Sequence, residues 1–256
     1  MAKVQVRASR TAGGATARGL QEPGRIKLVL HTRKACALVR GRRGDSEQGK
    51  APITGLLLFA ATVGRIWHAA AADDPYADWW LVEIEHQMET AREEIEAYRK
   101  QVAERLRQAP LVDLEAAVAA EPAEIELRFG TPYGFMASYL LVDYDGLVRE
   151  VMTARHVAVL DREAAERLIH EGGRAVRRAF HSAEGYRYLA LTRDDVRQGT
   201  AKARKARELM GELPRQVLEG KVRARHAPVR RARPAPEAAA AEGGGEPQAA
   251  GGGGAA

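Results

Sequence analysis

The sequence predicts a mainly α-helical α+β domain, in which a long helical hairpin accompanies a small antiparallel two-stranded ribbon. Three observations lead to this fold class. Of the 256 residues, 45% are hydrophobic but only 5% are aromatic, so the core is built mostly from Ala, Val, Leu and Ile. A long central stretch repeats apolar residues with helical spacing. Two short stretches alternate polar and apolar residues, as strands do.

The chain divides into one domain between two basic ends. Residues 1–22 hold Gly, Ala, Thr and Arg without periodicity, and we expect a disordered basic arm there. Residues 219–256 are rich in Arg, Pro, Ala and Gly, a composition that predicts a disordered tail because it buries little apolar surface. Residues 23–218 have the size of one globular domain.

Composition also favours a cytoplasmic protein. The single Cys36 excludes a disulfide framework and a zinc site made of several thiolates, and it suits a reducing compartment. No apolar targeting segment follows the first basic residues. The most apolar stretch, residues 53–72, is interrupted by Arg65 and His68, and its uninterrupted part is too short to cross a bilayer. We therefore expect no membrane partner.

The first predicted element is a strand over residues 25–31, which alternates polar and apolar side chains directly after Gly24. Thr32 is a suitable N-cap for a short helix through Val39. Gly41 is placed to end that helix, because glycine readily adopts the left-handed backbone conformation found after helices.

A polar, Gly-rich loop is predicted over residues 41–52, and Pro52 suits the first turn of a buried helix over residues 53–71. Residues 76–108 then carry the strongest periodic signal in the chain, which predicts an amphipathic helix with a heptad-like seam. We expect this helix to pack on its own domain, with an intermolecular coiled coil as the alternative. The seam residues recur every three or four positions: Leu81, Ile84, Met88, Ala91, Ile95, Tyr98, Val102 and Leu106.

A second strand is predicted over residues 125–129, which share the pattern Ile-x-Leu-x-(Leu/Phe)-x-Thr with the first strand. Strands this short are not stable alone, but the two could pair antiparallel. Arg25 and Lys27 would then face Glu124 or Glu126. The sequence leaves open whether the ribbon forms within one chain or between two.

Three helices complete the predicted domain. Pro132 is placed to open a helix that runs to His156, and Asp161 to cap the next one. Thr192, three residues before an aspartate, resembles a capping box for a final basic helix that ends at Met210.

Charge is segregated along the chain. Residues 1–45 hold eleven Lys or Arg against two acids, and residues 197–233 hold twelve against three. Between them, residues 73–126 hold fifteen acids against five bases. Two basic ends around an acidic middle indicate a polyanionic partner, with the acidic helix facing away from it.

No catalytic or metal-binding constellation is visible, so we expect no cofactor, no small-molecule substrate and no enzyme. Residues 44–51 (Gly-x-x-x-x-Gly-Lys-Ala) lack the Ser or Thr with which a P-loop ligates magnesium. Glu83 and His86 have the spacing of a carboxylate-bridged metal half-site, but no matching second half follows. Neither Cys36 nor any serine lies in a recognisable nucleophile context.

Basic side chains on the first strand and on several helices are the candidate functional residues. Arg25, Lys27 and His31 share one face of the strand, and a two-stranded ribbon fits the DNA major groove, where outward side chains read base edges. The alternative is an edge strand whose charges discourage aggregation. Candidate phosphate contacts, unless these are plain solvated helix faces, are Arg33, Lys34, Arg174, Arg177, Arg178, Lys202 and Lys205.

Several motifs resemble a known family, among them Asp-Pro-Tyr-Ala-Asp-Trp-Trp from Asp74 and His-Glu-Gly-Gly-Arg-Ala-Val-Arg-Arg from His170. The matching stretches follow one another in order over residues 24–215: 74–80, 131–134, 139–145, 153–156, 169–178 and 192–202. They resemble proteins encoded on integrating conjugative elements, which are grouped with the AcaB-like transcriptional regulators of conjugative plasmids. Those regulators are similar to ribbon–helix–helix proteins.

The resemblance implies a homodimeric transcriptional regulator that binds double-stranded DNA and controls conjugative-transfer genes, with Arg25, Lys27 and His31 as base readers. The chain is far longer than a simple ribbon–helix–helix protein. The alternative function is an accessory or scaffold protein of the conjugative transfer apparatus, which would bind a protein through the helix of residues 76–108. That alternative requires the apolar seam of this helix to be exposed in the folded monomer.

Overall fold

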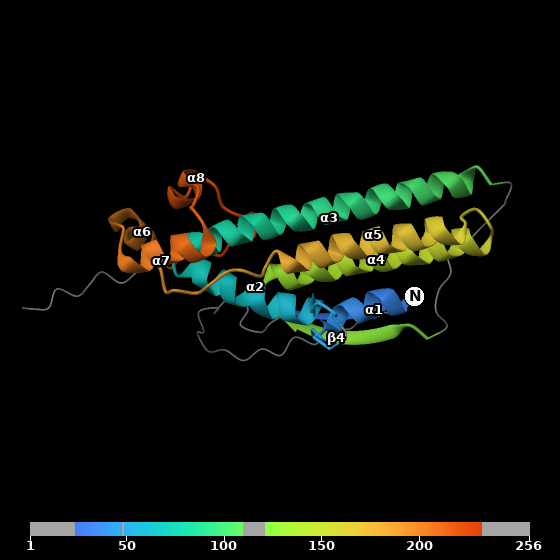
Figure 1. The fold of residues 1–256 in the computed structure, drawn as a ribbon, viewed down its shortest axis with the longest axis horizontal. Coiled ribbons are helices and arrows are strands. Elements are labelled where there is room, and N and C mark those ends of the chain that lie inside the picture. The colour runs from blue at the N-terminus through green and yellow to red at the C-terminus, as the bar shows by residue number, and fades with distance from the viewer. Residues whose placement is uncertain (1–23, 48, 110–120, 232–256) are drawn as a thin grey trace, which may run out of the picture.

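The structure, a computed structural model, describes residues 24–47, 49–109 and 121–231. The predicted basic arm over residues 1–22 and the end of the predicted tail lie outside these residues. In the described part of the chain, helices dominate and two small antiparallel sheets accompany them (Figure 1). The predicted mainly helical α+β class is thus confirmed. Within this part, no helix combines the length and the hydropathy that crossing a bilayer requires.

Three long helices lie side by side: α3 (Pro75–Arg107), α4 (Pro132–His156) and α5 (Arg162–His181). Their predicted starts are confirmed. Asp74 and Asp161 each accept backbone N–H bonds from the first turn of the helix that follows, which satisfies donors that have no partner inside the helix.

The apolar seam of α3 is buried against α4 and α5 of the same chain. Its most deeply buried members are Leu81, Ile84, Met88, Ala91, Ile95 and Val102, each at most 4% exposed. The seam therefore forms the core of the monomer. The exposed seam that the scaffold alternative requires is not found.

The predicted ribbon forms within one chain. β1 (Gly24–Leu30) pairs antiparallel with β4 (Ala123–Phe129), so the first strand ends one residue earlier than predicted and the second begins two residues earlier. The ribbon packs on α4 through apolar side chains of both strands. Gly134 of α4 permits this close approach, because a Cβ there would overlap the ring of Phe129.

The prediction of a loop over residues 41–52 followed by a helix from Ile53 is wrong. β2 (Gly41–Arg42) pairs with β3 (Ile53–Thr54), and α2 (Leu56–Ala71) begins only after this hairpin. The physical reason is a backbone contact between Gly41, whose φ is +71°, and Gly55. A Cβ on either glycine would overlap the backbone of the opposite segment, so the pairing depends on both.

The predicted final helix is also interrupted. The Thr192 capping box is confirmed, but α6 (Arg193–Gln198) ends at Gly199, which has the left-handed φ of +63°. α7 (Ala201–Met210) then starts in a new direction, and a short α8 (Arg215–Leu218) follows.

Residues 219–231, which composition assigned to the tail, lie against α3 instead. Arg223 donates to Asp78 of α3 (Nη2 to Oδ1, 2.9 Å), and Glu85 accepts the backbone N–H groups of Arg225 (2.7 Å) and His226 (2.8 Å). Composition could not indicate these contacts, because the carboxylates involved lie more than a hundred positions away in the sequence.

Candidate nucleic-acid interface

The solvent-facing side of the ribbon carries charges of both signs. Lys27 stands opposite Glu126 and forms an ion pair with Glu124 (Nζ to Oε2, 2.7 Å), in which both side chains are more than half exposed. Arg25 stands opposite Arg128 in the register of the two strands. An exposed ion pair contributes only about 0–1 kcal/mol, so Lys27 can exchange Glu124 for another acceptor at little cost.

His31 lies between the ribbon and α1 (Arg33–Arg40), and not in the strand as predicted. Its backbone N–H donates to Asp145 of α4 (3.0 Å), and Thr32 donates to the same carboxylate with its N–H (2.8 Å) and its hydroxyl (2.7 Å). Asp145 is only 3% exposed, and its hydrogen bonds to the two residues that join β1 to α1 tie both elements to α4. The Nδ1 atom of His31 is enclosed, so this side chain has less access to a base than Lys27.

The two candidate phosphate contacts of α1, Arg33 and Lys34, are exposed, while the other face of the helix is buried in the core. Lys34 extends toward α5. The pKa of Glu166 on α5 is lowered mainly by Arg162 and also by Arg155 and Lys34, which locates the charge of Lys34 near that carboxylate.

The β2–β3 hairpin brings three further exposed basic side chains, Arg42, Arg43 and Lys50, which motif reasoning did not single out. The hairpin contacts both α1 and α5, so these charges continue the basic surface of α1. The Arg-rich run around Gly41 was the available signal in the sequence. Its position on this surface follows only from the contact between the two glycines.

The three arginines predicted on α5 have different surroundings. Arg178 is held by an ion pair with Glu94 of α3 (2.6 Å), and Arg174 lies 3.7 Å from Glu171 of its own helix. Arg177 is half-buried, and among the described residues no hydrogen bond or ion pair engages its guanidinium.

The structure does not bring the predicted contacts Lys202 and Lys205 together with the ribbon. Both are exposed on α7, which lies with α6 and α8 at the end of the bundle where α3 begins (Figure 1). The ribbon and α1 lie farther along the bundle, beneath α4 and α5 in this view.

The acidic α3 and the basic α1 lie on different sides of α4. α4 contacts both α3 and the ribbon, and Figure 1 shows these two on opposite sides of it. α3 holds eight acids against five bases, whereas residues 33–50, which include α1 and the hairpin, hold six bases against two acids. The excess of bases over acids in α1 and the β2–β3 hairpin attracts a polyanion to this side of the molecule.

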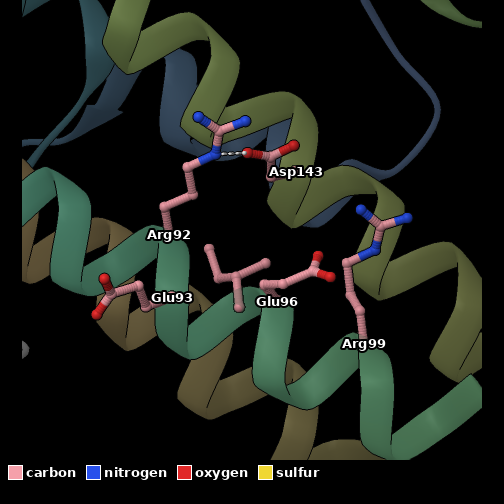
Figure 2. Close-up of a pocket in the computed structure, with 6 residues that line it drawn as sticks. Arg92, Glu93, Glu96, Arg99 and Asp143 are labelled. Carbon is pink, nitrogen blue, oxygen red and sulfur yellow. Dashed lines mark ion pairs between the residues drawn. The ribbon is translucent and has the colours of Figure 1, made fainter. Parts of the chain in front are cut away.

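A groove of about 380 Å3 lies between α3 and α4, and acidic and basic side chains both line it (Figure 2). Arg92 of α3 lies 3.2 Å from Asp143 of α4 across it, and Arg99 donates to Glu150 through Nη2 (2.6 Å) and Nε (3.0 Å). Both arginines of the groove are therefore already paired with carboxylates of α4. In the described part of the chain, no group of three or more His, Cys, Asp or Glu side chains could hold a metal ion.

Residues 20–231 match the family model described as transcriptional regulator AcaB. Among solved structures, the chain is similar to the crystal structure of selenomethionine-containing AcaB from uropathogenic E. coli. The two have 13% sequence identity and a TM-score of 0.51, and the match covers 77% of this chain and 95% of that one. At this identity the likeness concerns the fold alone. No curated protein sequence matches the chain.

Proposed function

Because the chain belongs to the AcaB family of transcriptional regulators, which is not a family of enzymes, we propose that it regulates transcription by binding double-stranded DNA. We further propose that it acts in the cytoplasm, on conjugative-transfer genes of an integrating conjugative element. The observation that carries the proposal is the charge polarity of the bundle. Basic side chains of α1 and the hairpin lie beside the ribbon, away from the acidic α3.

In this proposal the ribbon enters the major groove, as in a ribbon–helix–helix protein, and Arg25 and Lys27 read base edges. Glu124 and Glu126 on the same face suit the amino group of cytosine, which carboxylates accept. His31, at the end of the strand, would contribute only at the edge of the site. Both strands come from one chain, so each subunit of the proposed homodimer would bring its own ribbon to one half-site.

Phosphate contacts would supply most of the affinity. Arg33, Lys34, Arg174 and Arg177 lie on the elements next to the hairpin, and Arg178 would have to leave Glu94 to join them. Lys202 and Lys205, at the end of the bundle, would contact flanking DNA. Each phosphate neutralised releases condensed counterions, so the association constant should fall steeply as salt rises.

Fluorescence anisotropy of the full chain tests the proposal, with promoter fragments of the element, random duplex as competitor and a salt titration. We expect competitor-resistant binding to one fragment. Lys27→Ala should reduce discrimination against random duplex by about 1–3 kcal/mol. Lys100→Ala, which removes an exposed lysine from α3, is the matched control. Equal losses on cognate and random DNA would refute base reading by Lys27, and equal binding of every fragment by the unmodified chain would refute the function.

A further inference from the structure

A cleft of about 370 Å3 separates the β2–β3 hairpin from α5. Residues 52–54 line it on one side, and Arg174, Arg177, Arg178 and His181 line it on the other. Four basic side chains thus face a short apolar and hydroxyl-bearing segment, and no carboxylate is among the described residues that line the cleft.

The hairpin wall of this cleft is fixed without any ligand. Gly41 and Gly55 are in close backbone contact, which joins the two short strands, and the Thr54 hydroxyl is hydrogen-bonded to Glu184, which follows α5. The cleft is therefore preformed, and a ligand would not need to order its walls.

The carboxylates around the cleft are each engaged by a basic side chain. The pairs are Glu94 with Arg178 (2.6 Å), Glu184 with His181 (3.1 Å) and Glu171 with Arg174 (3.7 Å). Arg177 has no such partner among the described residues, although its side chain is half-buried. A half-buried guanidinium without a counterion is the group for which an anionic ligand gives the largest gain.

The Arg177 guanidinium lies over Gly173, next to the hydroxyl of Tyr144. A Cβ at Gly173 would lie 3.0 Å from its Nη1 atom and 2.9 Å from the hydroxyl oxygen of Tyr144, so both groups use the space that this glycine leaves. The Tyr144 hydroxyl donates to the carbonyl of Ile169 (3.1 Å), which fixes the ring. The positive charge of Arg177 also opposes the rise in the pKa of Tyr144 that burial causes, which agrees with their proximity.

We propose that this cleft binds a phosphate group, with Arg177 as its main ligand and Arg174 as the second. A guanidinium presents parallel N–H donors that match two phosphate oxygens. The source favoured here is a phosphodiester of the DNA backbone, which rests on the proposed function, and Arg177 would then set the register of the duplex relative to the ribbon. A free phosphate monoester or inorganic phosphate offers the same chemistry.

The test compares Arg177→Gln with Arg167→Gln in the full chain. Arg167 is another arginine of α5, exposed and outside the cleft lining, so the two variants remove the same charge from the same helix. One arm measures anisotropy with the cognate duplex over a salt series. The other arm measures the binding of inorganic phosphate by calorimetric titration. Thermal unfolding verifies that both variants fold.

We expect Arg177→Gln to weaken duplex binding about tenfold and to reduce the salt slope by about one, while Arg167→Gln has a much smaller effect. Arg177→Lys keeps the charge but loses the paired donors, so it should restore only part of the affinity. Arg177-dependent binding of inorganic phosphate, without any effect on the duplex, would keep the cleft but assign it to a free anion.

The cleft and the proposed function can fail separately. If Lys27→Ala loses discrimination while Arg177→Gln equals Arg167→Gln in both arms, the cleft is wrong and the DNA-binding function stands. If no duplex binds preferentially but inorganic phosphate binds in an Arg177-dependent way, the function is wrong and the cleft stands.

Discussion

Arg193 and Asp78 lie 115 positions apart and form an ion pair in which the arginine side chain is 3% exposed and the aspartate side chain is fully buried. Arg223 binds the same carboxylate (2.9 Å), and an Nη2 atom of Arg230 lies 3.5 Å from it. One carboxylate of α3 therefore holds both the start of α6 and the segment of residues 219–231.

Asp78→Asn should lower the free energy of unfolding by about 3–5 kcal/mol, because it removes the fully buried charge partner of Arg193 and Arg223 and leaves only the partly exposed Asp73 to pair with Arg193. Asp194→Asn is the matched control. Asp194 pairs with Arg197 at 3.0 Å on the surface, so its loss should cost at most about 1 kcal/mol. Urea unfolding followed by circular dichroism measures both, and equal midpoints for the two variants would contradict the role of Asp78.

Ile95→Glu should unfold the protein or destabilise it by more than about 3 kcal/mol, because Ile95 is fully buried where α3 meets α4 and α5. Val142→Glu places the same charge on a residue that is 45% exposed on α4, and it should change stability by about 0.5 kcal/mol or less. Thermal unfolding distinguishes them. A stable, folded Ile95→Glu variant that has lost a protein partner would support the scaffold alternative instead.

Stability should fall in alkaline solution partly through Tyr144. Burial, assisted by Asp145 and opposed by Arg177, raises the pKa of Tyr144 to about 12 in the folded protein. The unfolded chain loses this proton near pH 10, so the stabilisation is complete below that pH and is lost as pH rises toward 12.

Between about pH 10 and pH 12, the raised pKa of Tyr144 should lower the free energy of unfolding by about 2–3 kcal/mol. Tyr144→Phe should remove this part of the pH dependence. Chemical unfolding at a series of pH values measures the slope. Parallel profiles for the variant and the unmodified chain would show that Tyr144 does not titrate in this way.

The two groups of proposed phosphate contacts should respond differently to the length of the duplex. Replacing Arg33 and Lys34 with Gln should reduce the salt slope by about two even on a duplex limited to the recognised site, because α1 lies beside the ribbon. Replacing Lys202 and Lys205 should matter only when flanking DNA is added, because α7 lies at the end of the bundle. Anisotropy with short and extended duplexes checks this, and equal effects of both pairs on the short duplex would contradict it.

Local signals in the sequence determined most of the secondary structure. The caps Asp74, Asp161 and Thr192 and the three- and four-residue spacing of the α3 seam were readable because capping and helical periodicity depend on residues within a few positions of one another. The alternation of polar and apolar residues also predicted the two strands, which the sequence allowed to pair antiparallel either within one chain or between two. Charge counts predicted a polyanionic partner, but they could not show that the basic residues of α1 and of the β2–β3 hairpin lie together on the side of α4 away from α3.

Only the tertiary structure decided the features that depend on distant partners. The β2–β3 hairpin depends on the contact between Gly41 and Gly55. Residues 219–231 pack on α3 because Asp78 and Glu85 bind them, and the buried Arg193 pairs with Asp78 as well. It also distinguished three arginines of one helix that are equivalent in the sequence, since Glu94 engages Arg178 but no carboxylate of the described residues forms an ion pair with Arg177. Such contacts join segments far apart along the chain, so no local pattern of residues encodes them, and the fold alone determines which charges remain available for a ligand.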